Sequence, residues 1–207
     1  MRQSHQGFLP FALFLSLPLS GFSQKQELGL TLGGIAPQDR GFARLSGGTA
    51  LQANYGYRIW TNEKIAIFGE VHFLANGQRK ITSSDPRTTR DVATLYVTPG
   101  LRVKFALKSR VSPYLAVGGG YALYEQSLFQ LSGAANQAPR FRNGAALDYG
   151  AGFDVKLPEK GLLSRVNMRG EVRDFYSGSP DFNVAAFGGR QHNVVIGGGF
   201  VIKLGKR

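Results

Sequence analysis

The segment from Ser164 to Tyr176, SRVNMRGEVRDFY, constrains the fold of this chain more than any other, because polar and apolar residues alternate along it. A period of two places successive side chains on opposite faces of a β-strand. Thirteen residues at about 3.3 Å each also make a strand long enough to cross a bilayer core at a tilt of about 45°. We therefore predict a membrane-spanning strand with an oily face and a charged face. The oily face holds Val166, Met168, Gly170 and Val172, and the charged face holds Arg165, Asn167, Arg169, Glu171 and Arg173.

Seven further segments alternate in the same way, and no stretch after Glu27 has the pattern of an amphipathic helix. The sequence thus predicts an all-β fold with eight strands. The connections are alternately short and long, as in an up-and-down antiparallel transmembrane β-barrel with tight periplasmic turns and longer outer loops. The seven segments are 27–33, 51–59, 65–73, 94–105, 115–123, 147–156 and 193–204; the short connections are 61–63, 108–111 and 158–163, and the long ones are 37–47, 77–91, 126–143 and 177–190.

The first 23 residues have a different composition. Arg2 lies in a short polar start, residues 8–19 form an apolar run, and the small residues Gly21 and Ser23 precede a cleavage position. This is the pattern of a secretory signal peptide. The alternative is a membrane anchor, but twelve apolar residues are fewer than the roughly 20 that a spanning helix needs. We therefore predict a signal peptide at 1–23, cleaved after Ser23, and one outer-membrane β-barrel domain at 24–207.

The composition excludes several classes of protein. The chain has no cysteine, which excludes disulfides and thiolate metal sites. It is strongly basic, with 25 Lys and Arg against 13 Asp and Glu, but the basic residues are scattered rather than gathered in a nucleic-acid-binding patch. Most lie near expected turns and loops, where they can contact anionic lipid or lipopolysaccharide phosphates. The expected surroundings are therefore the lipid bilayer and lipopolysaccharide, with no nucleic acid, no metal and no cofactor.

Alternation alone does not say which face lies inside a barrel, because a soluble lipocalin-like barrel has an oily interior. Here the polar face consists largely of small residues, such as Gly118, Gly120 and Gly150, with isolated charges between them. Eight strands enclose a lumen only wide enough for side chains, which suits this mixture. Charges of both signs are needed there, because unpaired buried charges are costly. We therefore expect a structural network in the lumen that comprises Arg58, Glu70, His72, Arg102, Asp148, Asp154, Arg169, Glu171 and Arg173.

The pairing of the segment from Ser164 to Tyr176 with the segment before it can also be predicted. A turn centred near Lys160 would place Arg173 opposite Asp148, and Asn167 opposite Asp154. Opposite charges would then meet at matching depths inside the barrel.

Two local runs add to this pattern: SPYLAVGGGYALYE at 112–125 and the glycine-rich last segment at 194–204. With them, the chain resembles the small outer-membrane β-barrel proteins of Gram-negative bacteria, represented by the eight-stranded OmpA-like and OmpX-like barrels. The resemblance covers 25–207, although the final Lys-Leu-Gly-Lys-Arg lacks the terminal aromatic residue of many such barrels. It implies an eight-stranded barrel in the bacterial outer membrane, with both termini in the periplasm and insertion by the outer-membrane assembly machinery.

The function expected from these features is non-enzymatic, with a structural or adhesive role. The long loops at 78–91 and 128–142 carry several arginines and could hold extracellular ligands. A small porin or transport barrel is the first alternative. A lipid A-modifying enzyme is the second, and its candidate residues are His192 with Ser177, Ser179, Asp174 and Asp181, although these surround no known nucleophile motif.

Overall fold

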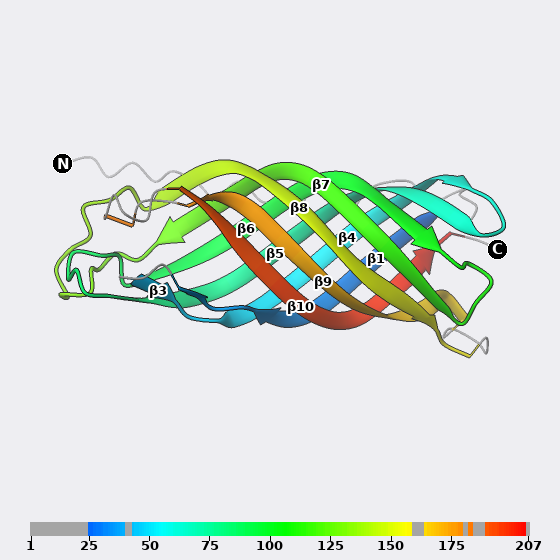
Figure 1. Ribbon diagram of the computed structural model, residues 1–207, viewed down its shortest axis with the longest axis horizontal. Coiled ribbons are helices and arrows are strands. Elements are labelled where there is room, and N and C mark those ends of the chain that lie inside the picture. Colours follow the sequence, from blue (N-terminus) through cyan, green and yellow to red (C-terminus); the bar gives the residue numbers. More distant parts are fainter. Residues whose placement is uncertain (1–24, 40–42, 159–163, 180–181, 184–188, 206–207) are drawn as a thin grey trace, which may run out of the picture.

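The computed structural model describes residues 25–39, 43–158, 164–179, 182–183 and 189–205, so the expected signal peptide at 1–23 lies outside the described residues. None of the residues in these ranges belongs to a helix long and apolar enough to span a bilayer. Eight long antiparallel strands wind into a ring (Figure 1). They are β1 (Gln26–Ile35), β4 (Gly48–Thr61), β5 (Ile65–Ser83), β6 (Asp91–Phe105), β7 (Val111–Gln126), β8 (Phe141–Lys156), β9 (Val166–Ser179) and β10 (Gly189–Leu204).

Hydrogen bonds between the first and last strands close the ring. Each strand pairs with the next one in this series, and β1 pairs with β10 from Gln26↔Leu204 to Ile35↔Val195. Every one of the eight strands therefore has a neighbour on both sides. Such closure satisfies the backbone polar groups within the sheet, which a bilayer requires. The structure confirms the predicted eight-stranded, up-and-down antiparallel barrel.

One end of the sheet extends beyond the predicted strands. β5 is 19 residues long and continues to Ser83, where β3 (Ala43–Leu45) pairs with it, and β2 (Gln38–Asp39) pairs with β3. The long connections expected at 37–47 and 77–91 are therefore partly strands. A register shift between Asn76 and Arg79 lets β5 accommodate one extra residue and continue pairing with β6.

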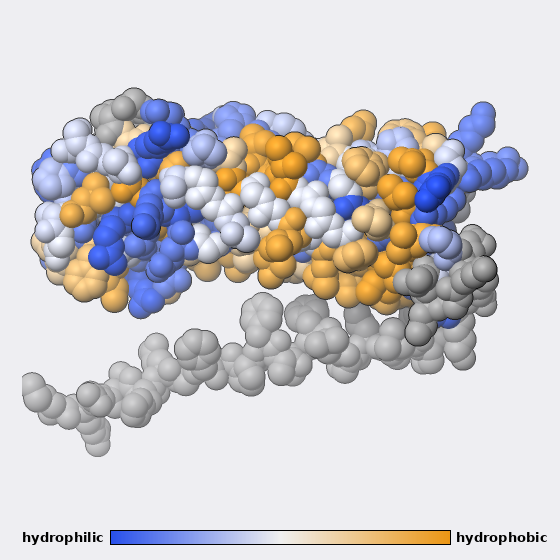
Figure 2. Space-filling view, turned by 90° about the horizontal axis from the view of Figure 1, so that it is seen from below, coloured by the Kyte–Doolittle hydropathy of each residue, from blue (hydrophilic) through white to orange (hydrophobic). Residues whose placement is uncertain are grey.

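The apolar side chains of the ring point outward. Leu30, Leu115 and Ile196 are 52%, 57% and 63% exposed on the barrel wall. On β7 the outward apolar positions run from Val111 to Leu123, which is about 40 Å along the strand and about 30 Å across a membrane at a tilt of about 40°. Figure 2 shows hydrophobic side chains along the barrel wall and hydrophilic ones gathered towards its two ends. The wall thus matches the thickness of a bilayer core.

The long connections lie together at one end of the barrel, on the left in Figure 1, and the short ones lie at the other end. At the long-loop end, the N–H of Thr89 donates to the carbonyl of Phe182 at 3.1 Å, and the N–H of Leu131 donates to that of Thr88 at 2.9 Å. Asn136 Nδ2 also donates to Thr89 Oγ1 at 3.1 Å. The side chain of Phe182 is fully buried. These contacts join 84–90, 127–140 and 182–183 into one packed unit, called the cap below.

Candidate functional site

The inward faces of the strands bring many charged side chains together inside the ring, and this lumenal network is the candidate site. Strand alternation determines its membership, because every second residue must point inward. Each charged member is at most 6% exposed. The members are Glu27 on β1, Glu70 on β5, Arg102 and Lys104 on β6, Asp148 and Asp154 on β8, and Arg169, Glu171 and Arg173 on β9.

Asp154 is the centre of the half of the network that lies nearer the short turns. Arg169 pairs with it in a bidentate arrangement, with Nε donating to Oδ1 at 2.8 Å and Nη2 donating to Oδ2 at 3.0 Å. Lys104 Nζ lies 2.6 Å from Asp154 Oδ2 and 3.1 Å from Glu27 Oε1. The two parallel hydrogen bonds from Arg169 fix the orientation of the Asp154 carboxylate and also compensate its charge. Lys104 thereby connects β6 to both β1 and β8 through the lumen.

Arg173 is the centre of the other half. Its Nη1 donates to Asp148 Oδ2 at 2.7 Å, and its Nε donates to Glu171 Oε2 at 3.3 Å. Its Nη2 also pairs with Glu70 on β5, the strand on the opposite side of the ring. One buried guanidinium therefore meets three carboxylates from three strands.

Arg102 joins the two halves. Its Nε lies 2.6 Å from Glu70 Oε2, and its Nη2 donates to Glu27 Oε2 at 3.0 Å. Its side chain is completely buried. The ion pairs thus form one connected network that crosses the lumen.

Neutral side chains complete the network. Tyr114 donates its hydroxyl to Glu171 Oε2 at 2.7 Å, and Thr31 donates its hydroxyl to Glu171 Oε1 at 2.8 Å. The guanidinium of Arg169 also lies over the Tyr114 ring, 4.8 Å from its centroid. His72 contacts the amide oxygen of Gln52 through Nε2 at 3.1 Å. The buried Glu171 carboxylate thus accepts hydrogen bonds from neutral side chains and also forms an ion pair. A buried charge needs both to offset the cost of removing it from water.

Glycines make room for these long side chains. A Cβ added at Gly118 would lie 2.2 Å from Asp148 Oδ1, and one added at Gly56 would lie 2.7 Å from Arg102 Nη2. Both distances are far below van der Waals contact. The glycine-rich polar face that the sequence shows is therefore the space in which the charged side chains pack.

Eight of the nine residues expected in the lumenal network lie buried inside the ring, and their side chains contact other members of the network. Arg58 is the exception, because it is half-buried at the short-turn mouth and forms no ion pair with a described residue. Arg165 was expected on the charged face of the strand, but it is exposed beside Ser164 in a helical turn before β9 begins.

The predicted register between β8 and β9 was wrong by two residues. Asp154 lies opposite Arg169 rather than Asn167, and Arg173 lies opposite Gly150 rather than Asp148. Because β9 begins only at Val166, the connection is centred later than Lys160. Arg173 still reaches Asp148, since a long side chain can contact the diagonal position on a neighbouring strand.

Several members of the network were not singled out from the sequence, and three of them contact its charged groups closely. They are Glu27, Lys104 and Tyr114, and the neutral Thr31 and Gln52 were not singled out either. Glu27 alternates in step with the inward Thr31, and Lys104 alternates in step with Arg102. Strand parity therefore identifies such residues, whereas their partners depend on the closure of the ring.

The candidate enzyme residues around His192 are only partly brought together. His192 Nδ1 lies 2.5 Å from Asp174 Oδ2, and Tyr149 donates its hydroxyl to the same oxygen at 2.6 Å. This group lies on the outward face, whereas Ser177 points inward, with its Oγ 2.6 Å from the hydroxyl of Tyr124. Asp181 lies outside the described residues, and Ser179 is the last residue of β9. No serine nucleophile is thus seen beside the Asp174 and His192 pair in the described part of the chain.

Comparisons with known proteins agree with this architecture. The sequence profile named outer membrane protein beta-barrel domain matches residues 9–199. The match to the solved structure of Neisserial surface protein A (NspA) has 14% sequence identity and a TM-score of 0.55, and it covers 88% of this chain and 98% of the NspA chain. The match to the outer membrane protein OprG from Pseudomonas aeruginosa has 15% sequence identity and a TM-score of 0.56, and it covers 88% of this chain and 97% of the OprG chain. No curated protein sequence matches the chain significantly.

Proposed function

This chain belongs to the outer membrane protein beta-barrel domain family, and we propose that it is a non-enzymatic barrel of the bacterial outer membrane with a structural or adhesive role. In this proposal a signal peptide at 1–23 directs its export and is cleaved, and the outer-membrane assembly machinery inserts the domain at 24–207. The bilayer and lipopolysaccharide then surround its apolar wall. The observation that carries the proposed role is the network of ion pairs across the lumen.

This network favours a structural role over transport. Opening a path along the lumen would separate Arg173 or Arg102 from its carboxylates and break several ion pairs at once. An eight-stranded ring also has little room for water once side chains occupy it. The interior is therefore better suited to holding the barrel together than to passing solutes.

The cap supports the adhesive part of the proposal. Long loops of outer-membrane barrels face the cell exterior, and here they are held together by hydrogen bonds between loops. The side chains of Arg87, Arg90 and Arg140 are 75%, 55% and 53% exposed. An ordered basic surface attracts anionic partners and avoids much of the entropy cost of ordering loops on binding.

Single-channel recording of the purified protein in planar bilayers tests the sealed lumen. We expect no discrete conductance steps from the folded protein, whose folding is checked by a gel shift between unboiled and boiled samples. Discrete steps from the wild type would refute the proposal and favour the small porin or transport barrel.

The lipid A-modifying alternative is tested separately. It needs a nucleophile beside Asp174 and His192, and the inward direction of Ser177 argues against one. We expect lipid A from cells that express the wild type or His192→Ala to have the same mass spectrum as lipid A from cells without the protein. A mass change that depends on His192 would instead establish an enzyme.

A further inference from the structure

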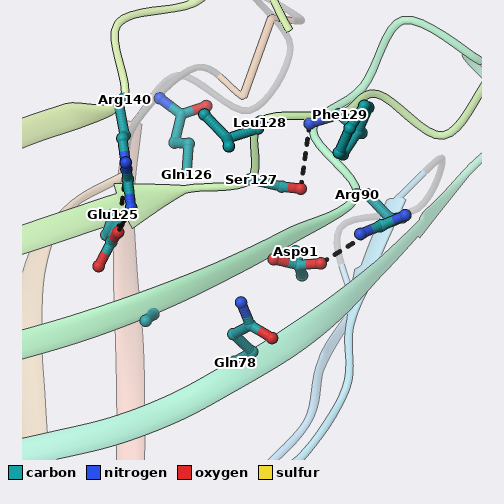
Figure 3. A pocket seen from close by; sticks show the side chains of 10 residues that line it. Gln78, Arg90, Asp91, Glu125, Gln126, Ser127, Leu128, Phe129 and Arg140 are labelled. Atoms are coloured by element: carbon teal, nitrogen blue, oxygen red, sulfur yellow. Dashed lines mark hydrogen bonds and ion pairs between the residues drawn. The ribbon is translucent and has the colours of Figure 1, made fainter. Parts of the chain in front are cut away.

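A pocket of about 260 Å³ opens on the outer wall of the barrel, where β5, β6 and β7 meet the cap (Figure 3). It is called the rim pocket below, and its polar walls come from separate parts of the chain. Figure 3 shows Arg90 and Arg140 on opposite sides of it. The residues used in the argument are Gln78, Arg90, Asp91, Glu125, Phe129 and Arg140.

The rim pocket begins directly above the apolar wall. Leu95 on β6 and Leu123 on β7 are cross-strand partners and form the last large apolar pair, with exposures of 40% and 41%. The next outward pair is Ala93↔Glu125, about 7 Å further along the strands. If the wall lies in the hydrocarbon of the outer leaflet, as the proposed function requires, the pocket lies at the depth of the lipid head groups.

Both arginines of the rim pocket are held in place but remain accessible. Arg140 donates to Glu125 Oε1 from Nη2 at 2.6 Å, and Arg90 Nε lies 3.4 Å from Asp91 Oδ2. The Arg90 guanidinium also lies over the ring of Phe129, 5.5 Å from its centroid. More than half of each arginine side chain stays exposed. Each guanidinium therefore keeps N–H groups for a further acceptor, since arginine has five.

The combination of charges indicates the class of ligand. Two arginines across a pocket suit phosphate groups, which they can bind through two parallel hydrogen bonds. The carboxylates of Asp91 and Glu125 and the amide of Gln78 line the same pocket and can accept hydrogen bonds from hydroxyl groups. A simple anion would use the arginines and be repelled by Asp91 and Glu125, whereas a phosphorylated sugar would use both sets. We propose that the rim pocket binds the phosphorylated sugar head group of an outer-leaflet glycolipid, an inference that rests on the proposed outer-membrane location.

The test uses the full folded chain in detergent micelles and bisphosphorylated lipid A as the probe, with bound lipid measured by native mass spectrometry. The double variant R90Q/R140Q is expected to weaken binding at least tenfold. The control R44Q removes an exposed arginine of the same end that does not line the pocket, and it is expected to change binding less than twofold. Ala93→Phe, which fills the pocket and keeps both arginines, should weaken binding as the double variant does.

Two further lipids separate the parts of the ligand. Phosphatidylglycerol supplies phosphate without the sugar, and dephosphorylated lipid A supplies the sugar without phosphate, so each should bind at least tenfold more weakly than lipid A. Wild-type affinity in both R90Q/R140Q and Ala93→Phe, or equal affinity for phosphatidylglycerol, would overturn the inference. If the folded barrel does not conduct and also does not bind lipid A in this way, only the proposal for the rim pocket is refuted. If the barrel conducts, only the proposal of a sealed lumen is refuted.

Discussion

Replacing Asp154 with Asn should destabilise this barrel strongly, although the two side chains have nearly the same shape. Asp154 receives the bidentate pair from Arg169 and the contact from Lys104 at 2.6 Å, and Arg102 Nη1 lies 3.8 Å away. At an effective dielectric constant of about 20, each unit charge pair at about 4 Å contributes about 4 kcal/mol. The cost of burying the carboxylate offsets several kcal/mol of this sum. Removing one partner of such a buried cluster should therefore cost about 3–5 kcal/mol.

The measurement is reversible unfolding by denaturant in lipid vesicles. The chain has one tryptophan, Trp60, which is 49% exposed on the outer wall, so its fluorescence reports transfer between lipid and water. Glu63→Gln is the control, because Glu63 pairs with Lys108 at 2.9 Å while its side chain is 82% exposed, and such surface pairs contribute about 0–1 kcal/mol. A loss for Asp154→Asn within about 1 kcal/mol of this control would refute the reasoning. It would mean that water in the lumen screens the charges.

A double-mutant cycle adds a second criterion. If Asp154 and Lys104 interact directly, the variant that carries both Asp154→Asn and Lys104→Met should lose less stability than the sum of the two single changes. Strict additivity would show that the two charges are not coupled.

Two further predictions concern a lumenal glycine and a cap carboxylate. Gly118→Ala should lower the free energy of unfolding by about 1–3 kcal/mol, since its methyl group would meet Asp148 Oδ1. Gly144→Ala should change this free energy little, because an added Cβ there would meet nothing within 4 Å. Equal effects of the two changes in the same unfolding assay would contradict the packing argument. Hydrogen bonds from Arg87 lower the pKa of Asp85 to about 2, so this interaction is present at neutral pH and is lost only as the pH falls through about 2. NMR titration should move this pKa back towards 3.8 in Arg87→Gln, and an unchanged midpoint would exclude Arg87 as the cause.

The sequence predicted the strands well where alternation is long and uninterrupted. Along β7, Leu115 and Val117 point outward and Ala116 is buried, as their parity requires. β5 is the exception, because Gly77 and Gln78 break the alternation and were assigned to a loop. In the structure a register shift accommodates them, and pairing with β3 and β6 continues the strand. A neighbouring strand can thus override a local signal for a turn.

The ion-pair partner of a lumenal residue was harder to predict than the strand face on which that residue lies. Arg173 could be assigned to the inward face from its own neighbours in sequence, but its contact with Glu70 joins residues 103 positions apart. The pairing of β8 with β9 was missed by two residues because register depends on the length of the turn, which alternation does not report. The rim pocket had no signal in the sequence, since Arg90 and Arg140 come from different loops.

By itself, then, the sequence determined the all-β class, the number of ring strands and the face to which most residues of the uninterrupted strands point, because side-chain direction in a strand is a local property with a period of two. Only the tertiary structure decided which lumenal charges pair, where β5 ends and which loop residues surround the rim pocket. These features depend on register, on ring closure and on contacts between distant loops. The distances between the side chains involved are set only when all eight strands come together.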